Sequence, residues 1–130
     1  MERQTRQRQA IRDVIARSQG PMSPREVLSR ASEQVAGLGM ATIYRTLKSM
    51  LEAGEVVQVE VPGGAPRYEL SGKQHHHHFH CRACGCMYEI DGCPGDMVPM
   101  LPPGFVLESH TLTLNGVCAA CVRVDRAPKR

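Results

Sequence analysis

The chain has 130 residues, of which 42% are hydrophobic but only 4% aromatic, and tryptophan is absent. This length fits one ordinary domain or two small ones with aliphatic cores, and half-size cores favour support from a metal or a dimer partner. No apolar run approaches the length of a membrane span. The net charge of +3 is uneven: residues 1–54 carry nine Lys or Arg against five Asp or Glu, which suits a polyanionic partner.

Helical patterning fills this basic half. Residues 5–18 place apolar side chains on one face of a helix, at Ala10, Ile11, Val14 and Ile15. A second helix is predicted to begin at Ser23, because Ser23, Pro24 and Glu26 form a capping box with proline at the first helical position. A third helix is predicted over residues 41–53, ending before Gly54.

The third predicted helix has two contrasting faces. Ile43, Leu47 and Met50 recur at helical spacing and must face a core. The opposite face is small, hydroxylated and cationic, a mixture suited to phosphates and to base edges in a major groove. Its candidate DNA-binding residues are Ala41, Thr42, Tyr44, Arg45 and Lys48. An ordinary solvated helix face is the alternative.

The following element favours DNA binding. Val57, Val59 and Val61 alternate, residues 62–66 form a turn, and residues 67–70 return as a second strand. Three helices followed by a hairpin predict a winged helix-turn-helix over residues 1–70, with the third helix in the recognition position. Residues 71–73 then form a short polar hinge.

Beyond the hinge the patterning becomes β, which predicts an α+β protein with a small α/β domain over residues 74–121. Strands are predicted over residues 74–81, 87–90 and 105–114. Four prolines between residues 91 and 104 restrict any helix there to a short one, over residues 95–101. Residues 122–130 form a basic tail that we expect to be disordered.

Two C-x-x-C pairs supply four thiolates, at Cys81, Cys84, Cys118 and Cys121. This set predicts a closed, tetrahedral, structural zinc site. Disulfides are one alternative, but no apolar signal segment opens the chain, so a reducing cytoplasm is expected. A thioredoxin-like redox site would need a surrounding βαβ pattern, which the sequence lacks.

Five of the six histidines stand immediately ahead of the first C-x-x-C pair. An expression tag would be an unbroken run at a terminus, whereas this run is internal and interrupted by Phe79. Alternate side chains of a strand share a face. One face therefore has His76, His78 and His80, and the other has His75, His77 and Phe79.

The first of these faces suggests a regulatory metal. His76 and His78 aim two imidazoles at one point, and the nearest carboxylates are Glu69 and Glu89. A metal held by Glu69 from the first domain and by histidines from the second would restrict the hinge and preorganise the DNA-binding shape. The alternatives are unoccupied surface imidazoles and a Glu69 that is a plain surface residue.

Together the motifs resemble one known family. The run G-M-A-T-I-Y-R-T-L, the Y-E-L before the hinge, the H-H-H-x-F-H-C-x-x-C-G segment and the late C-x-x-C are similar to those of the ferric uptake regulator family. These proteins are bacterial repressors that respond to metals or peroxide. The resemblance covers the chain except its tail. It implies a homodimer formed by the C-terminal domain and a palindromic double-stranded DNA operator.

The resemblance also implies ligands. It places structural zinc on the four thiolates and the regulatory metal on Glu69, His76, His78 and Glu89. It places a further metal site in the dimerisation domain, on His75, His77, Asp96 and His110. Tyr44 and Arg45 match its DNA-contacting positions.

Three departures leave the regulatory metal open. Pro21 and Met22 stand where iron and peroxide sensors have a histidine, Ser71 where zinc sensors often have a cysteine, and His77 where the iron type has an aspartate. A histidine-rich shell favours zinc over manganese, while iron(II) also accepts imidazole with carboxylate. We treat Cys86 and Cys93 as ordinary residues, with Cys86 a candidate substitute ligand.

The sequence therefore predicts a metal-dependent repressor, not an enzyme, with zinc favoured over iron(II) as co-repressor and manganese a further candidate. One alternative is a peroxide sensor in which iron(II) promotes oxidation of a ligand histidine. A remote alternative is a zinc hydrolase with Glu69 or Glu89 as general base.

Overall fold

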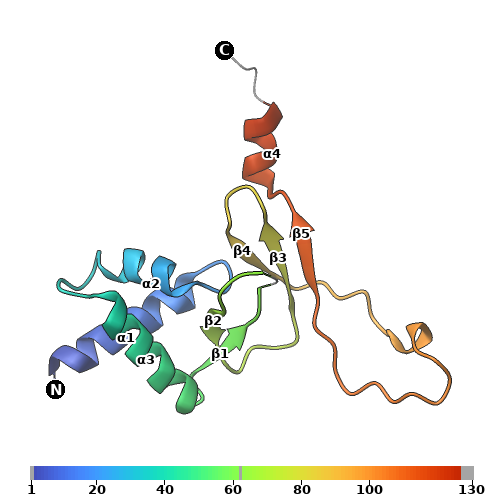
Figure 1. Cartoon of the computed structure of the whole chain (residues 1–130), viewed down its shortest axis with the longest axis horizontal. Helices are drawn as coiled ribbons and strands as arrows, with labels where there is room; N and C mark the ends of the chain where they lie inside the picture. The colour runs from blue at the N-terminus through green and yellow to red at the C-terminus, as the bar shows by residue number, and fades with distance from the viewer. Residues whose placement is uncertain (1, 62, 127–130) are drawn as a thin grey trace. The chain divides into compact units, whose positions relative to one another are not determined.

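The computed structural model describes residues 2–61 and 63–126, which form two compact units, Met1–Lys73 and Gln74–Arg130. We call them the N-terminal and C-terminal units and describe each by itself (Figure 1). The expected hinge, residues 71–73, ends at the boundary between them. Among the described residues, no helix has both the length and the apolar character needed to cross a bilayer.

The N-terminal unit has three helices followed by a hairpin, in the order predicted for a winged helix-turn-helix (Figure 1). The helices are α1 Glu2–Arg17, α2 Pro24–Ala31 and α3 Met40–Glu52. The hairpin, or wing, pairs β1 Val56–Val59 with β2 Arg67–Leu70 in antiparallel register. Helix α1 begins at Glu2, before the predicted start at residue 5. The apolar pattern did not indicate this first turn, because its residues are polar and exposed.

The predicted capping box at the start of α2 is present. The Ser23 side chain accepts a hydrogen bond from the Glu26 N–H at 3.2 Å, and Glu26 Oε1 accepts one from the Ser23 N–H at 2.9 Å. These bonds satisfy two amides that a helix start leaves unpaired. The same Glu26 carboxylate accepts from Arg67 at 2.9 Å, which ties the wing to α2.

The core of the N-terminal unit is aliphatic, as predicted, and all three helices contribute to it. Ile43, Leu47 and Met50 of α3 are at most 1% exposed. The wing adds Val56 instead of continuing the predicted Val57, Val59 and Val61 alternation. Its first strand ends at Val59, and Val57 is 41% exposed. The register explains this shift, because Val56 is the residue paired with Leu70 beside the core.

The C-terminal unit is a three-stranded sheet of order β4-β3-β5, followed by helix α4, Ala119–Arg126 (Figure 1). Its strands are β3 His77–Cys81, β4 Met87–Ile90 and β5 Thr113–Gly116. Strands β3 and β4 are antiparallel, whereas β3 and β5 are parallel. Between β4 and β5, residues 91–112 leave the sheet as a long excursion that carries the short 3-10 helix η1, Val98–Met100.

Three expectations for this unit were wrong. The first strand begins at His77 and not at residue 74. The third covers only residues 113–116, because a strand needs a partner and, among the described residues, 105–111 form no strand pairing; Val106 is 84% exposed. The tail is helical through Arg126, and residues 127–130 lie outside the described residues.

One close backbone approach fixes the third strand. Gly116 is the register partner of Cys81, and a Cβ added to it would lie 3.1 Å from the Phe79 ring. The Gly116 carbonyl also accepts from the Arg82 N–H at 2.8 Å. Glycine therefore allows β5 to lie against the end of β3, where the first C-x-x-C pair begins.

Replacing Leu47 by alanine tests the assignment of the core face of α3. We expect a loss of about 2–5 kcal/mol in the free energy of unfolding, because the cavity lies in a fully buried cluster. Urea denaturation followed by the helix signal, which comes mainly from α1–α3, measures it. Lys48→Ala, one residue further on the exposed face, should stay within about 0.5 kcal/mol. Equal losses would contradict the two-faced helix.

Candidate metal centres and nucleic-acid interface

The predicted DNA-binding face of α3 is exposed. Tyr44 is 53% exposed, and Arg45 and Lys48 are also exposed. Ala41 is exposed and Thr42 is half-buried; the Thr42 hydroxyl accepts a hydrogen bond from Arg45 Nη2 at 3.2 Å. The structure thus gathers the small, hydroxylated and cationic side chains on one surface, as the periodicity predicts.

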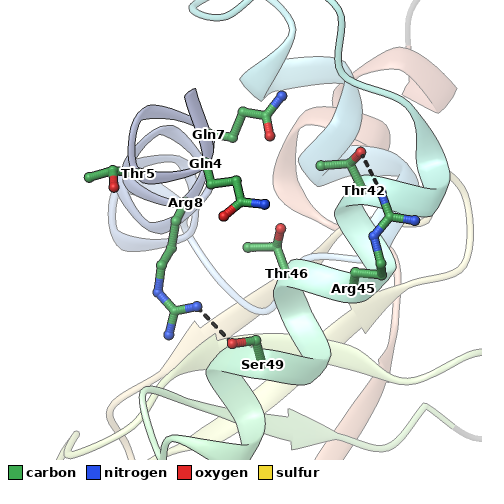
Figure 2. Close-up of a pocket in the computed structure, with 8 residues that line it drawn as sticks. All are labelled: Gln4, Thr5, Gln7, Arg8, Thr42, Arg45, Thr46 and Ser49. Carbon is green, nitrogen blue, oxygen red and sulfur yellow. Dashed lines mark hydrogen bonds between the residues drawn. The ribbon is translucent and has the colours of Figure 1, made fainter. Parts of the chain in front are cut away.

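A polar groove runs beside this face, between α1 and α3 (Figure 2). It has a volume of about 450 Å³ and is lined by Gln4, Thr5, Gln7, Arg8, Thr42, Arg45, Thr46 and Ser49. Arg8 reaches from α1 to donate to Ser49 Oγ at 2.9 Å, and its other terminal nitrogen lies 3.1 Å from Glu55 Oε2. The groove therefore presents two guanidinium groups among hydroxyls and amides. Sequence reasoning did not single out Arg8.

The four cysteines of the two C-x-x-C pairs come together. Their Sγ atoms all lie within 4.8 Å of one another, and Cys84 Sγ is 3.9 Å from Cys118 Sγ. The first pair occupies the turn between β3 and β4, where Gly85 has φ +78° and donates to the Cys81 carbonyl at 2.9 Å. The second pair enters α4. None of the six cysteines forms a disulfide.

Backbone amides point at these sulfurs. The N–H groups of Cys84 and Cys118 lie 3.4 and 3.3 Å from Cys81 Sγ. The amide of Cys118, followed by that of Cys84, lowers the pKa of Cys81 to about 6. The side chain of Cys118, with burial, raises the pKa of Cys121 to about 12, because neighbouring thiols cannot all ionise without a cation.

This arrangement fits zinc. With Zn–S bonds of about 2.3 Å, a tetrahedral shell separates its sulfurs by about 3.8 Å, and the measured Cys84–Cys118 distance is 3.9 Å. Four thiolates at such spacing form a closed structural site with no position left for substrate. The predicted set Cys81, Cys84, Cys118 and Cys121 therefore suits that metal.

A second cluster lies at the start of β3. The rings of His76 and His78 are 4.8 Å apart, and Glu89 is the cross-strand partner of His78. His76 Nδ1 is 2.7 Å from the Gln74 carbonyl, and donation there leaves Nε2, 3.5 Å from Glu89 Oε1, to bind a metal. Three of the four predicted regulatory ligands thus belong to one patch of the C-terminal unit.

The fourth predicted regulatory ligand, Glu69, belongs to the N-terminal unit. It lies on β2 and is 5% exposed, with Lys73 Nζ 4.0 Å from its Oε2. Ser71 donates to the Gly54 carbonyl at 2.5 Å through its hydroxyl and to the Glu55 carbonyl through its amide. These two hydrogen bonds of Ser71 hold the end of β2 to the start of the hairpin.

The positions where iron and peroxide sensors have a histidine belong to the core of the N-terminal unit. Pro21 and Met22 are buried, and the Met22 backbone pairs with Tyr68.

A third cluster includes a ligand that we had treated as an ordinary residue. His75, His77 and His110 come together as the resemblance implies, but the fourth member is Cys93. Asp96 is not part of the group; its Oδ1 accepts from the Val98 N–H at 3.0 Å and caps η1. Spacing gave no signal for Cys93, since it lies in an irregular segment. His80, on the same strand, belongs to none of the clusters found among the described residues.

His77 is the buried member of the third cluster, at 2% exposure. Burial, followed by the positive neighbours His75 and His110, lowers its pKa, so the imidazole is held neutral. A neutral imidazole is the form that binds a metal. Its Nε2 lies 3.3 Å from His110 Nε2, while its Nδ1 is buried with no hydrogen-bond partner among the described residues.

Comparison with known proteins decides the family. A family model described as "Ferric uptake regulator family" matches residues 2–115. The chain belongs to the ferric uptake regulator family. The resemblance inferred from the motifs is thereby confirmed, and so is the α+β fold class with a winged helix and a cysteine cluster suited to zinc.

Relatives in this family differ in the metal that their names give. The chain is 30% identical to the ferric uptake regulation protein of Campylobacter upsaliensis, over 90% of this chain and 78% of that protein. It is 31% identical to the zinc uptake regulation protein of Mycobacterium tuberculosis CDC 1551, over 92% of this chain and 94% of that protein. A solved "Zinc Uptake Regulator Complexed With Zinc AND DNA" is 28% identical with a TM-score of 0.60, covering 93% of this chain and 84% of that one. These are regulators and not enzymes.

Removing one thiolate tests the cysteine site. Cys118→Ser is expected to lose the tightly held zinc and to destabilise the C-terminal unit, because metal binding contributes folding free energy. Zinc content after mild chelation and sedimentation of the full chain measure both effects, with dimer loss expected. Cys86→Ser changes a cysteine of the same turn that is outside the group and should keep the zinc. A Cys118→Ser protein that retains zinc and its assembly would refute the assignment.

Proposed function

We propose that this protein is a cytoplasmic, dimeric transcriptional repressor that binds a palindromic operator when a divalent metal occupies its regulatory site. The observation that carries the proposal is the pairing of two features in one chain. One is an exposed cationic helix face on a winged helix, and the other is a set of imidazole, carboxylate and thiol groups in the C-terminal unit that lie close enough to share metal ions. Zinc is the favoured co-repressor over iron(II).

The α3 face supports DNA as the partner. Arg45 and Lys48 project from a helix whose opposite side is locked into the core, so the helix can enter a groove as a rigid unit. The groove of Figure 2 adds Arg8, Gln4 and Thr5 from α1 beside them, groups that suit backbone phosphates. The DNA complex of the similar zinc uptake regulator points the same way.

The regulatory set consists of His76, His78 and Glu89 in the C-terminal unit, together with Glu69 before the hinge. When bound, a divalent cation would offset the charge of the carboxylates and favour one hinge arrangement over others. Because no ligand is expected at Pro21 or Met22, the set offers two imidazoles and two carboxylates, and four donors suit the tetrahedral shell of zinc better than a larger shell of iron(II). Because similar proteins are named for iron and for zinc, the experiment below compares both metals.

Exposed apolar side chains in the C-terminal unit support a homodimer. Phe105 and Val106 are 63% and 84% exposed, in a stretch that pairs with no other described segment, and Leu114 of β5 is 51% exposed. We infer that a second copy of this unit buries these large apolar side chains. A second copy of the same unit also satisfies the two-fold symmetry of a palindromic site.

Alanine at Arg45 or Lys48 tests the DNA face. Each change should weaken binding to a duplex selected with the wild-type protein, and each should lower the salt slope of log K by about 0.9 if it removes one phosphate contact. Binding is measured by fluorescence anisotropy across a salt series. Arg30→Ala removes an exposed cation from α2 and is the matched control. An unchanged salt slope in both variants would show that this face does not meet DNA.

Alanine at His76 tests the metal switch. Protein stripped of labile metal but retaining its cysteine-bound zinc is titrated with zinc, iron(II), manganese or nickel in the same DNA assay. We expect a gain in affinity with one metal, zinc first, and loss of that gain in His76→Ala. Glu69→Gln should also weaken it, which tests the ligand before the hinge.

His80→Ala, on the same strand but outside the clusters, should respond as the wild type does. Equal DNA binding with and without every metal would refute the co-repressor role of the metal but not the assignment of the winged helix as the DNA-binding unit.

A further inference from the structure

We propose that Cys93, and not Asp96, completes the further metal site that the family resemblance implies on His75, His77 and His110, and that this thiolate makes it a closed, tetrahedral zinc site at the base of the residue 91–112 excursion. This centre is distinct from the regulatory set and from the four-cysteine site. The inference depends on the C-terminal unit alone and stands whether or not the protein binds DNA.

The donor atoms all lie within 4.8 Å of one another, and the three distances to His110 match the edges of a tetrahedral shell. His110 Nε2 lies 3.2 Å from His75 Nε2, 3.3 Å from His77 Nε2 and 3.5 Å from Cys93 Sγ. Zn–N bonds of about 2.05 Å and a Zn–S bond of about 2.3 Å give tetrahedral edges of about 3.3 Å between nitrogens and about 3.6 Å between nitrogen and sulfur. All three measured edges agree with those values to about 0.1 Å.

Chain topology explains why the thiol and not the carboxylate joins the histidines. Residues 91–112 leave the sheet after β4 and return to it before β5, where His78 donates its amide to the Leu112 carbonyl. Cys93 stands at the start of this excursion and His110 at its end, so both lie beside β3. Asp96 is three residues further out, where it caps η1. The excursion thus closes on the cluster at its base.

Ligand chemistry then selects the metal. Three imidazoles and one thiolate are soft-to-borderline donors that suit zinc and disfavour magnesium and manganese, which prefer oxygen. A carboxylate in the fourth position would have been compatible with harder ions. Because four protein ligands fill a tetrahedral shell, this site leaves no open position for chemistry and would hold the excursion to the sheet.

Cobalt(II) is a suitable probe, because a thiolate bound to it produces a sulfur-to-metal charge-transfer band in the near ultraviolet and a tetrahedral shell produces intense visible bands. The full chain, with zinc retained on its four cysteines, is titrated with cobalt(II). Zinc is quantified in each sample, so that exchange at the four-cysteine site is detected. The regulatory set contains no thiolate and contributes no charge-transfer band.

Wild-type protein is expected to show the charge-transfer band and to lose it when zinc is added back. Cys93→Ser should lose the band, while Cys86→Ser and Asp96→Asn, the matched controls for a second thiol and for the carboxylate, should keep it. Amide hydrogen exchange of residues 91–112 gives a second readout, with slower exchange on zinc addition in the wild type alone. A band that survives in Cys93→Ser with its cysteine-bound zinc intact, or no band in the wild type, would overturn the proposal.

Discussion

The C-terminal unit depends on donor clusters more than on an apolar core. Of its described side chains, only His77, Cys81 and Met87 are buried, and the first two are candidate ligands. One copy of such a unit buries little apolar surface to offset the entropy of ordering its chain, so bound metal or a second copy has to contribute the rest. Without a metal, closely spaced imidazoles and thiols gain little from one another. A bound cation makes the same spacing favourable, because every donor atom then binds it. Metal occupancy and folding of this unit are therefore coupled.

The N-terminal unit, in contrast, is stabilised by an apolar core and not by donor clusters. Its helices bury a continuous aliphatic cluster that includes Ile11, Val27 and Leu47. No ligand is needed to hold this surface in shape, so the polar face of α3 stays preformed. The proposed metal response would therefore act through the hinge or the assembly, and not on whether α3 is formed.

Sequence patterns predicted the fold where one local rule decides the outcome. Helical periodicity located α3 to within a residue, and the Ser23–Glu26 capping box marked the start of α2. Strand alternation sorted His75 with His77 and His76 with His78, and the ring contacts follow that sorting. Local patterns failed where pairing decides. The apolar run from Phe105 resembles a strand, but the described chain offers it no neighbour, and Cys93 meets His110 only because the excursion returns to the sheet.

The two thiol-containing centres and the regulatory set differ in a way that bears on metal sensing. Four thiolates, or three imidazoles with one thiolate, form filled tetrahedral shells that hold zinc tightly and exchange it slowly. A sensor must instead release its metal when the supply falls, and the proposed regulatory set, with Glu69 before the hinge and its other ligands after it, would couple metal binding to the arrangement of the hinge. The apparent affinity of that proposed set would then be its intrinsic affinity multiplied by the fraction of molecules whose hinge is already in the competent arrangement. Under this proposal the filled centres would stay loaded while the regulatory set responds, so that zinc could serve in the same chain both as a structural ion and as a signal.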